Sequence, residues 1–152
     1  MPLAAYGKQL VAESMYTKGG HFLFAALLLR KEGGSEYVVL HLLCHGIETT
    51  LKGLLLLRAY DKHMPRMKAY GHDLEALVAA IVAEFKMHPL RSNLTRELKG
   101  LSTLYKKHLL RYGSPQDIFV DAATIPSDRV LRRMVAVLRL ADRHLARRGR
   151  TP

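Results

Sequence analysis

Hydrophobic residues recur at helical spacing along almost the whole chain. Between residues 36 and 61, apolar side chains follow i, i+3, i+4 spacing, which places them on one face of a helix. No run of residues alternates convincingly between apolar and polar with a period of two, as a half-buried strand does. The pattern predicts amphipathic helices at about residues 4–31, 36–61, 72–87, 90–111 and 128–148.

Glycine and proline mark the expected interruptions between and within these helices. Gly19–Gly20 predicts a weak point where the first helix bends or breaks. Residues 61–71 contain Pro65 and few periodic apolar positions, so a loop is expected there. Residues 112–127 are expected to form a long connection. Three residues stand where the N-cap of a helix is expected: Ser35, Asp73 and Ser127.

Five helices with short connections predict an all-α fold, an up-and-down antiparallel helical bundle of about five helices. The length favours a single domain over residues 1–152, with a tail that frays from about residue 147. The single cysteine excludes an internal disulfide and suits a reducing compartment. The N-terminus has no signal-peptide pattern, and the apolar runs are shorter than the roughly 18 residues of a membrane span. A cytoplasmic protein without membrane contact is therefore predicted.

The charge of the chain is concentrated at its C-terminal end. The net charge is +11, and eight arginines but only one acid, Asp142, lie between residues 129 and 150. The basic helix has two interpretations: a face that binds nucleic acid, or a solvated face that keeps the protein soluble. The residues expected on a nucleic-acid face are Arg132, Arg139, Arg143 and Arg147.

The second predicted helix carries a polar stripe beside its apolar one. His41, His45, Glu48 and Lys52 are spaced i, i+4, i+7 and i+11. The two histidines are spaced like a zinc pair, with Cys44 beside them, but no glutamate lies between them as in a zinc protease helix and there is no Cys-x-x-Cys pair. We predict neither a metal site nor another cofactor, and expect the histidines on a helix face or an interface.

Glu48 and Lys52 form a favourable helical pair in an apolar helix, so we expect both to be partly buried. A buried ion pair needs further hydrogen-bonding partners to offset desolvation. Candidates stand at the start of the next helix and near the end of the fourth. The predicted polar cluster or binding pocket comprises Glu48, Lys52, His72, Asp73, Arg111 and Tyr112.

Three stretches in order, "HGIETTLKGLLL", "YGHDLEAL" and "LYKKHLLRYGSP", resemble the HEPN domain family over roughly residues 36–115. The resemblance implies antiparallel helices, a homodimer and a cytoplasmic location. Some members are encoded beside a nucleotidyltransferase, which makes such an enzyme an expected partner. Several members are ribonucleases with an Arg-x(4–6)-His motif whose side chains meet across a dimer cleft. Others lack the motif and are regarded as binding or accessory proteins.

Two functions follow from the resemblance. The motif has three matches, Arg58–His63, Arg66–His72 and Arg139–His144, and none has the polar and tyrosine context of the active members. We therefore predict a non-catalytic or degenerate HEPN-like protein that binds a partner protein, a nucleotide or RNA. The alternative is a toxin-like, metal-independent ribonuclease, in which Arg139 stabilises phosphate charge and His144 acts as general acid or base.

Overall fold

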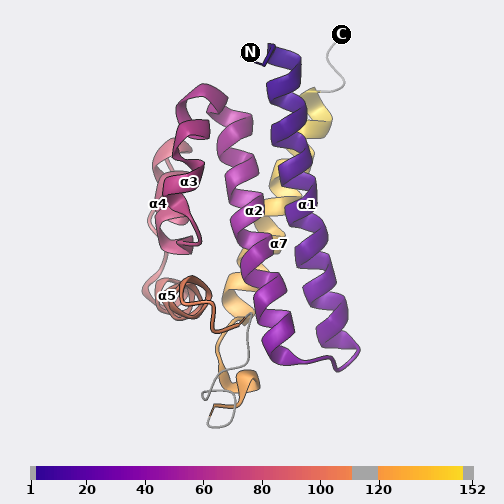
Figure 1. Ribbon diagram of the computed structural model, residues 1–152, viewed down its shortest axis with the longest axis vertical. Helices are drawn as coiled ribbons and strands as arrows, with labels where there is room; N and C mark the ends of the chain where they lie inside the picture. The colour runs from indigo at the N-terminus through magenta and orange to yellow at the C-terminus, as the bar shows by residue number, and fades with distance from the viewer. Residues whose placement is uncertain (1–2, 111–119, 149–152) are drawn as a thin grey trace.

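The chain folds as a bundle of helices (Figure 1). The computed structural model describes residues 3–110 and 120–148, and these residues contain no strand. The prediction of an all-α bundle is confirmed. Its five main helices are α1 (Ala5–Lys31), α2 (Glu36–His63), α4 (Leu74–Glu84), α5 (Ser92–Lys106) and α7 (Asp128–Arg148).

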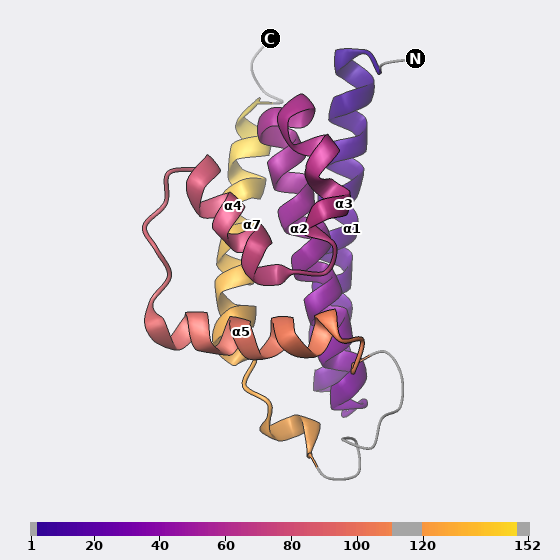
Figure 2. The same cartoon turned by 60° about the vertical axis from the view of Figure 1, so that its left-hand side comes forward.

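Helix α2 lies at the centre of the bundle and contacts α1, α4 and α5. α1 and α2 form an antiparallel pair, and α7 runs along this pair (Figure 1). α5 lies across the long helices rather than along them (Figure 2). The crossing departs from a simple up-and-down arrangement, and it brings the last turn of α5 against the middle of α2.

Glycines set the close contact between α1 and α2. A Cβ atom on Gly53 would lie 2.6 Å from the backbone nitrogen of Tyr16, and one on Gly19 would lie 2.4 Å from the nitrogen of Thr50. Only glycine allows backbones to approach this closely. The expected break at Gly19–Gly20 is therefore wrong: α1 is continuous through both residues, because Gly19 serves packing rather than bending.

The loop expected over residues 61–71 is also wrong. α2 continues to His63, with non-helical backbone angles at Ala59 (φ −155°, ψ 78°). A 3₁₀ turn, η1 (Met64–Arg66), and a short helix, α3 (Met67–Tyr70), follow directly. Proline is tolerated in the first turn of a helix, so Pro65 starts a turn here instead of ending one. His63 is 2% exposed, and its Nε2 lies 2.9 Å from Glu84 Oε2, which fixes the end of α2 to α4.

The expected N-cap at Asp73 is confirmed, whereas α4 and α5 are shorter than expected. Asp73 caps α4, because its Oδ1 accepts a hydrogen bond from the Ala76 amide at 3.0 Å. Ser35 occupies the N-cap position of α2 but makes no side-chain capping bond. α5 ends at Lys106, and His108 adopts a left-handed backbone (φ 57°) in the turn that follows. The hydroxyl of Ser127, just before α7, accepts a hydrogen bond from Arg30 Nη2 at 2.9 Å.

The core is aliphatic and centres on α2. Leu40, Leu43, Leu55, Leu74 and Leu101 are fully buried in it. The helical stretch Glu36–Tyr70 is long and apolar enough to cross a membrane by length and composition alone. The core helix of a globular protein has the same composition, and 61% of the most apolar window of this stretch is buried inside the structure.

Candidate functional site

A buried carboxylate lies at the junction of α2, α4 and α5. Glu48 is on α2, one helical position away from the apolar stripe, and only 6% of its surface is exposed. An ionised carboxylate in such a place requires donors for both oxygens. The sequence supplies one donor a turn further along α2, and the crossing of α5 brings another.

Three side chains donate hydrogen bonds to Glu48. Lys52 Nζ lies 2.6 Å from Oε1 and also donates to the Gly71 carbonyl oxygen at 2.9 Å. The Tyr105 hydroxyl donates to Oε2 at 2.6 Å, and His72 Nδ1 lies 2.9 Å from the same oxygen. Bonds of this kind to a charged acceptor are short and strong. The cluster therefore ties the middle of α2 to the start of α4 and the end of α5.

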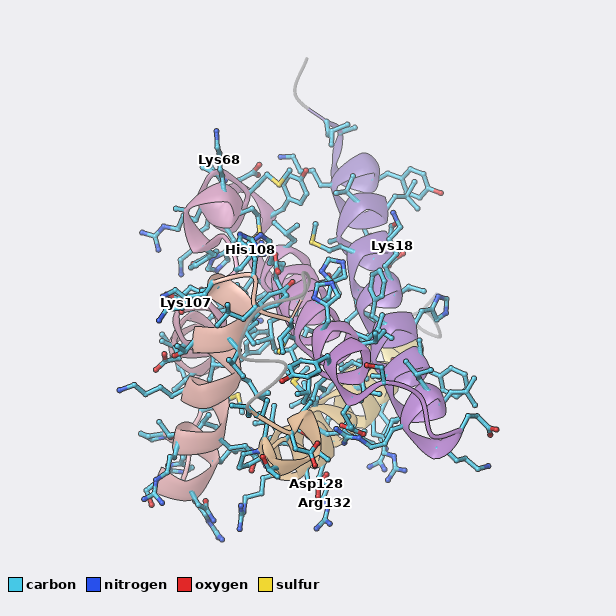
Figure 3. The ribbon with its side chains drawn as sticks, turned by 60° about the horizontal axis from the view of Figure 1, so that its bottom comes forward. Lys18, Lys68, Lys107, His108, Asp128 and Arg132 are labelled. Carbon is cyan, nitrogen blue, oxygen red and sulfur yellow. The ribbon has the colours of Figure 1, made fainter. Side chains whose placement is uncertain are left out.

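The Tyr105 hydroxyl also fixes the protonation of a second histidine. His45 Nδ1 lies 3.0 Å from the Tyr105 oxygen. Because Tyr105 gives its only proton to Glu48, His45 Nδ1 must carry the hydrogen of this contact. The rings of His72 and His108 meet edge to face with centroids 5.3 Å apart. His108 lies at the end of α5 in Figure 3.

Two buried groups of α2 have shifted pKa values. Burial raises the pKa of Glu48, but the hydrogen bonds from Lys52, Tyr105 and His72 outweigh this effect and hold the pKa below its ordinary value. Burial, with the nearby Glu48 charge, raises the pKa of the Cys44 thiol far above its usual range. Cys44 is therefore a protonated core residue and not a nucleophile.

The structure brings together three of the six residues expected in the polar cluster: Glu48, Lys52 and His72. Asp73 does not contact Glu48, because its second carboxylate oxygen instead bonds to Lys106 Nζ at 2.8 Å. Arg111 and Tyr112 lie outside the described residues. Sequence reasoning missed Tyr105 and His45 as members of the cluster.

The hydrogen bonds around Glu48 hold the helices together and leave no free carboxylate oxygen for a ligand. Both oxygens of Glu48 are occupied, and only His72, with 38% of its side chain exposed, reaches solvent to a large extent. Among the described residues, no three His, Cys, Asp or Glu side chains are arranged to hold a metal ion. His41 and His45 stack on one another with centroids 6.2 Å apart.

A second feature is a groove between the α4–α5 connection and the first half of α7. It has a volume of about 780 Å³. None of the described residues that line it is acidic. We call it the basic groove, and its charged side chains are those of Arg91, Arg129, Arg132 and Arg133.

The basic groove opens onto the outer face of α7. Arg139 and Arg143 follow Arg132 on the same side of the helix and are exposed, as Arg132 is. Figure 3 shows Arg132 pointing away from the bundle at the start of α7. The predicted nucleic-acid face is thus continuous for these three residues, and the side chain of Arg147 lies outside the described residues, as does most of the tail expected to fray.

Both acids of α7 are held by α1. Asp128 Oδ1 lies 3.4 Å from Arg30 Nη1, and Asp142 Oδ1 accepts a hydrogen bond from the Tyr16 hydroxyl at 2.8 Å. Asp128 also lines a hollow of α7 together with Arg132 and Arg139, so its charge lies beside the start of the arginine face. Arg132, Arg139 and Arg143 outnumber this one acid, so the net charge of the arginine face stays positive.

Glu97 on α5 fixes the start of α7. Its side chain is almost fully buried, with Oε1 accepting from the Val130 amide at 3.0 Å and Oε2 3.4 Å from Arg129 Nη1. A carboxylate at this position satisfies a free amide of the first turn and opposes the positive end of the helix dipole. Sequence reasoning missed this residue, because the partner lies 33 positions away.

Arg139 and His144, the alternative ribonuclease pair, line different surface pockets. Arg139 lines a hollow with Leu131 and Val135, between α1 and α7. His144 lines a different one, between α2 and α7, together with Arg58. A catalytic Arg139–His144 pair would therefore need two copies of the chain.

Comparison of the chain with models of known protein families, with curated proteins and with solved structures finds no match in any of the three. The function must therefore be argued from the site itself.

Proposed function

We propose that this chain is a HEPN-like protein that binds single-stranded RNA without cleaving it. The observation that carries the proposal is the arginine-rich surface formed by the basic groove and the outer face of α7. Arginine is well suited to phosphate, because its planar fork donates two parallel hydrogen bonds. Arg132 and Arg139 are seven residues apart on one helix, which separates them by about 10 Å along its axis. A flexible polyanion can bridge this spacing.

The Glu48 cluster has a supporting role in this proposal. It ties α5 to α2, and Glu97 on α5 in turn fixes the first turn of α7. Contacts from α2 to α5 and from α5 to α7 therefore hold the arginine face in a fixed position. Rigid presentation reduces the entropy lost when the side chains engage phosphate groups.

Fluorescence anisotropy with a labelled oligouridine, repeated over a range of KCl concentrations, tests the proposal. Changing Arg132, Arg139 and Arg143 together to glutamine should weaken binding roughly tenfold or more. It should also lower the slope of log affinity against log salt by about 2, since each lost phosphate contact on single strands contributes roughly 0.7.

The matched control changes Lys68, Lys99 and Lys107 to glutamine. Lys68 lies on α3, Lys99 on α5 and Lys107 directly after α5; all three are exposed and none lines the basic groove. Their loss alters the net charge by the same amount. Figure 3 shows Lys68 and Lys107 pointing outward on the side formed by α3 and the end of α5. An equal loss of affinity in both variants would mean that only net charge attracts RNA, and the proposed face would be wrong.

The same reaction mixtures decide between binding and cleavage. Gel analysis should show intact RNA after prolonged incubation with the protein. Cleavage that disappears in a His144→Ala variant would replace the binding proposal with the ribonuclease alternative. Intact RNA with unchanged affinity in His144→Ala supports a binding role.

We further propose that the protein is a homodimer. The outer face of α1 supports this, because Leu10, Phe24 and Leu28 are 46%, 65% and 48% exposed there. Exposed apolar side chains in one region are typical of an interface. Light scattering at micromolar concentration should give twice the chain mass, and Phe24→Glu should give the monomer. A wild-type monomer under these conditions would contradict the proposal.

A further inference from the structure

The basic groove continues inward into a small apolar cavity, which we call the aliphatic pocket. The pocket lies between α2, α4, α5 and α7, and its volume is about 60 Å³. The atoms that it exposes to a ligand are all apolar. Its walls include Ile47 and Leu51 from α2, Val78 and Ile81 from α4, Leu98 from α5 and Met134 from α7.

The groove and the pocket are parts of one site. Met87, Leu90, Leu94 and Arg133 line both of them. The aliphatic side chains of this set form the passage from the groove to the pocket, and Arg133 stands at its edge. A single ligand can therefore place a charged end among the arginines and an apolar end inside the bundle.

The pocket selects an aliphatic group rather than a nucleobase. A base requires hydrogen-bonding partners for its edge or an aromatic face on which to stack. The pocket offers neither, since its lining residues include no aromatic side chain and expose no polar atom. Burying a polar edge there without a partner would be unfavourable.

The groove selects an anion. Arg91, Arg132 and Arg133 are exposed and form no ion pair with any described residue, whereas Arg129 is held by Glu97. Three unengaged guanidinium groups around one opening attract a carboxylate, which arginine binds with two parallel hydrogen bonds. From these two halves we propose that the site binds an alkyl carboxylate, with the carboxylate at Arg91, Arg132 and Arg133 and the chain end in the aliphatic pocket.

The size of the pocket limits the ligand. A cavity of about 60 Å³ is small, so only the end of an alkyl chain fits inside. The remaining methylene groups would lie on Met87, Leu90 and Leu94 in the passage. Short and medium alkyl carboxylates match this arrangement. The inference goes beyond RNA binding and does not require it, although both ligands would use Arg132.

Calorimetric titration of the full chain with butyrate, hexanoate and octanoate, each below its micelle concentration, tests the proposal. Affinity should rise by about fourfold for each added methylene group until the pocket is filled. Octyltrimethylammonium, with the same chain and the opposite charge, should not bind. Equal binding of the cation, or no dependence on chain length, would overturn the proposal, and neither result depends on a variant that has to fold.

Two variants separate the two halves of the site. Arg133→Gln should weaken octanoate binding at least tenfold, whereas Arg96→Gln, an exposed arginine of α5 outside the groove, should leave it unchanged. Val78→Phe fills the pocket from a partly buried position and should remove the dependence on chain length. An octanoate affinity that is the same in Arg133→Gln and Arg96→Gln would refute the assigned head-group site.

The RNA measurement distinguishes this proposal from the proposed function. Val78→Phe leaves every arginine in place, so RNA affinity should be unchanged in that variant. Octanoate binding without RNA binding would reject only the proposed function. RNA binding without octanoate binding would reject only the alkyl carboxylate site.

Discussion

Replacement of Lys52 by methionine is expected to cost far more stability than the same change at an exposed lysine. Lys52 and Glu48 are 2.6 Å apart with side chains only 13% and 8% exposed. Methionine keeps the apolar length of lysine and removes the charge. It leaves Glu48 Oε1 without its donor and the Gly71 carbonyl without its own. Glu48 retains Tyr105 and His72 on its other oxygen, so the expected loss is about 2–4 kcal/mol, near the lower end for a broken buried pair.

The chain contains a matched control for this change. Lys8 and Asp61 form an ion pair of similar length, 2.7 Å, but Asp61 has 79% of its side chain exposed. Lys8→Met should therefore cost no more than about 1 kcal/mol. Urea unfolding followed by circular dichroism gives both values from the shift of the midpoint at constant slope. Equal losses in Lys8→Met and Lys52→Met would refute the buried-pair reasoning.

The pH dependence gives a second check with a defined sign. Glu48 has its pKa lowered in the folded protein, so its ionised form contributes stability at pH values above the ordinary value of 4.5. That contribution is lost as the pH falls through the folded pKa. The stability difference between wild type and Lys52→Met should therefore be largest near neutral pH and should shrink below about pH 4. A difference that stays constant down to pH 3 would show that the loss does not come from the charge of Glu48.

Three further changes, and a control at Gly100, test the framework around the site by urea or thermal unfolding. Gly53→Ala should cost about 1–3 kcal/mol, because the new Cβ would lie 2.6 Å from the Tyr16 backbone nitrogen, whereas Gly100→Ala, with nothing within 4 Å, should stabilise α5 by up to about 1 kcal/mol. Equal effects of the two would contradict the close helix contact. Asp73→Ala removes the cap of α4 and should cost about 1 kcal/mol, with faster amide hydrogen exchange in its first turn. Glu97→Ala leaves a buried amide of α7 without its acceptor and should cost about 1–3 kcal/mol, and unchanged exchange at the start of α7 would argue against this role.

Helical periodicity was sufficient to predict the bundle and half of the polar cluster. Glu48 and Lys52 are neighbours on one helix, and His72 stands at the start of the next segment that returns along α2, so local spacing already places them together. Tyr105 could not be assigned in the same way. The direction of its hydroxyl depends on the crossing of α5 over α2, which no local pattern encodes.

The errors in the segment boundaries have similar causes. Pro65 and the low periodicity of residues 61–71 suggested a loop, but tertiary contacts such as His63 with Glu84 keep the segment helical. From the sequence alone, Gly19 could indicate either a flexible point in the helix or a close helix contact. The position of Thr50 on the facing helix shows that it is a close contact. The basic groove was also beyond local reasoning, since Arg91 and Arg133 meet only after the chain has folded back.

The pairing of α1 with α2 also has a consequence for the order of folding. The two helices are adjacent in the chain and are joined only by residues 32–35, so their contacts close a short loop at little entropic cost. α7 is the last of the five main helices to be synthesised and makes its anchoring bonds to Tyr16, Arg30 and Glu97, all far away in sequence. We expect the first two helices to form a hairpin early in synthesis and α7 to dock later, once its own residues have left the ribosome. Until then, the apolar side of α7 is uncovered, and this interval is when a nascent chain is most exposed to aggregation.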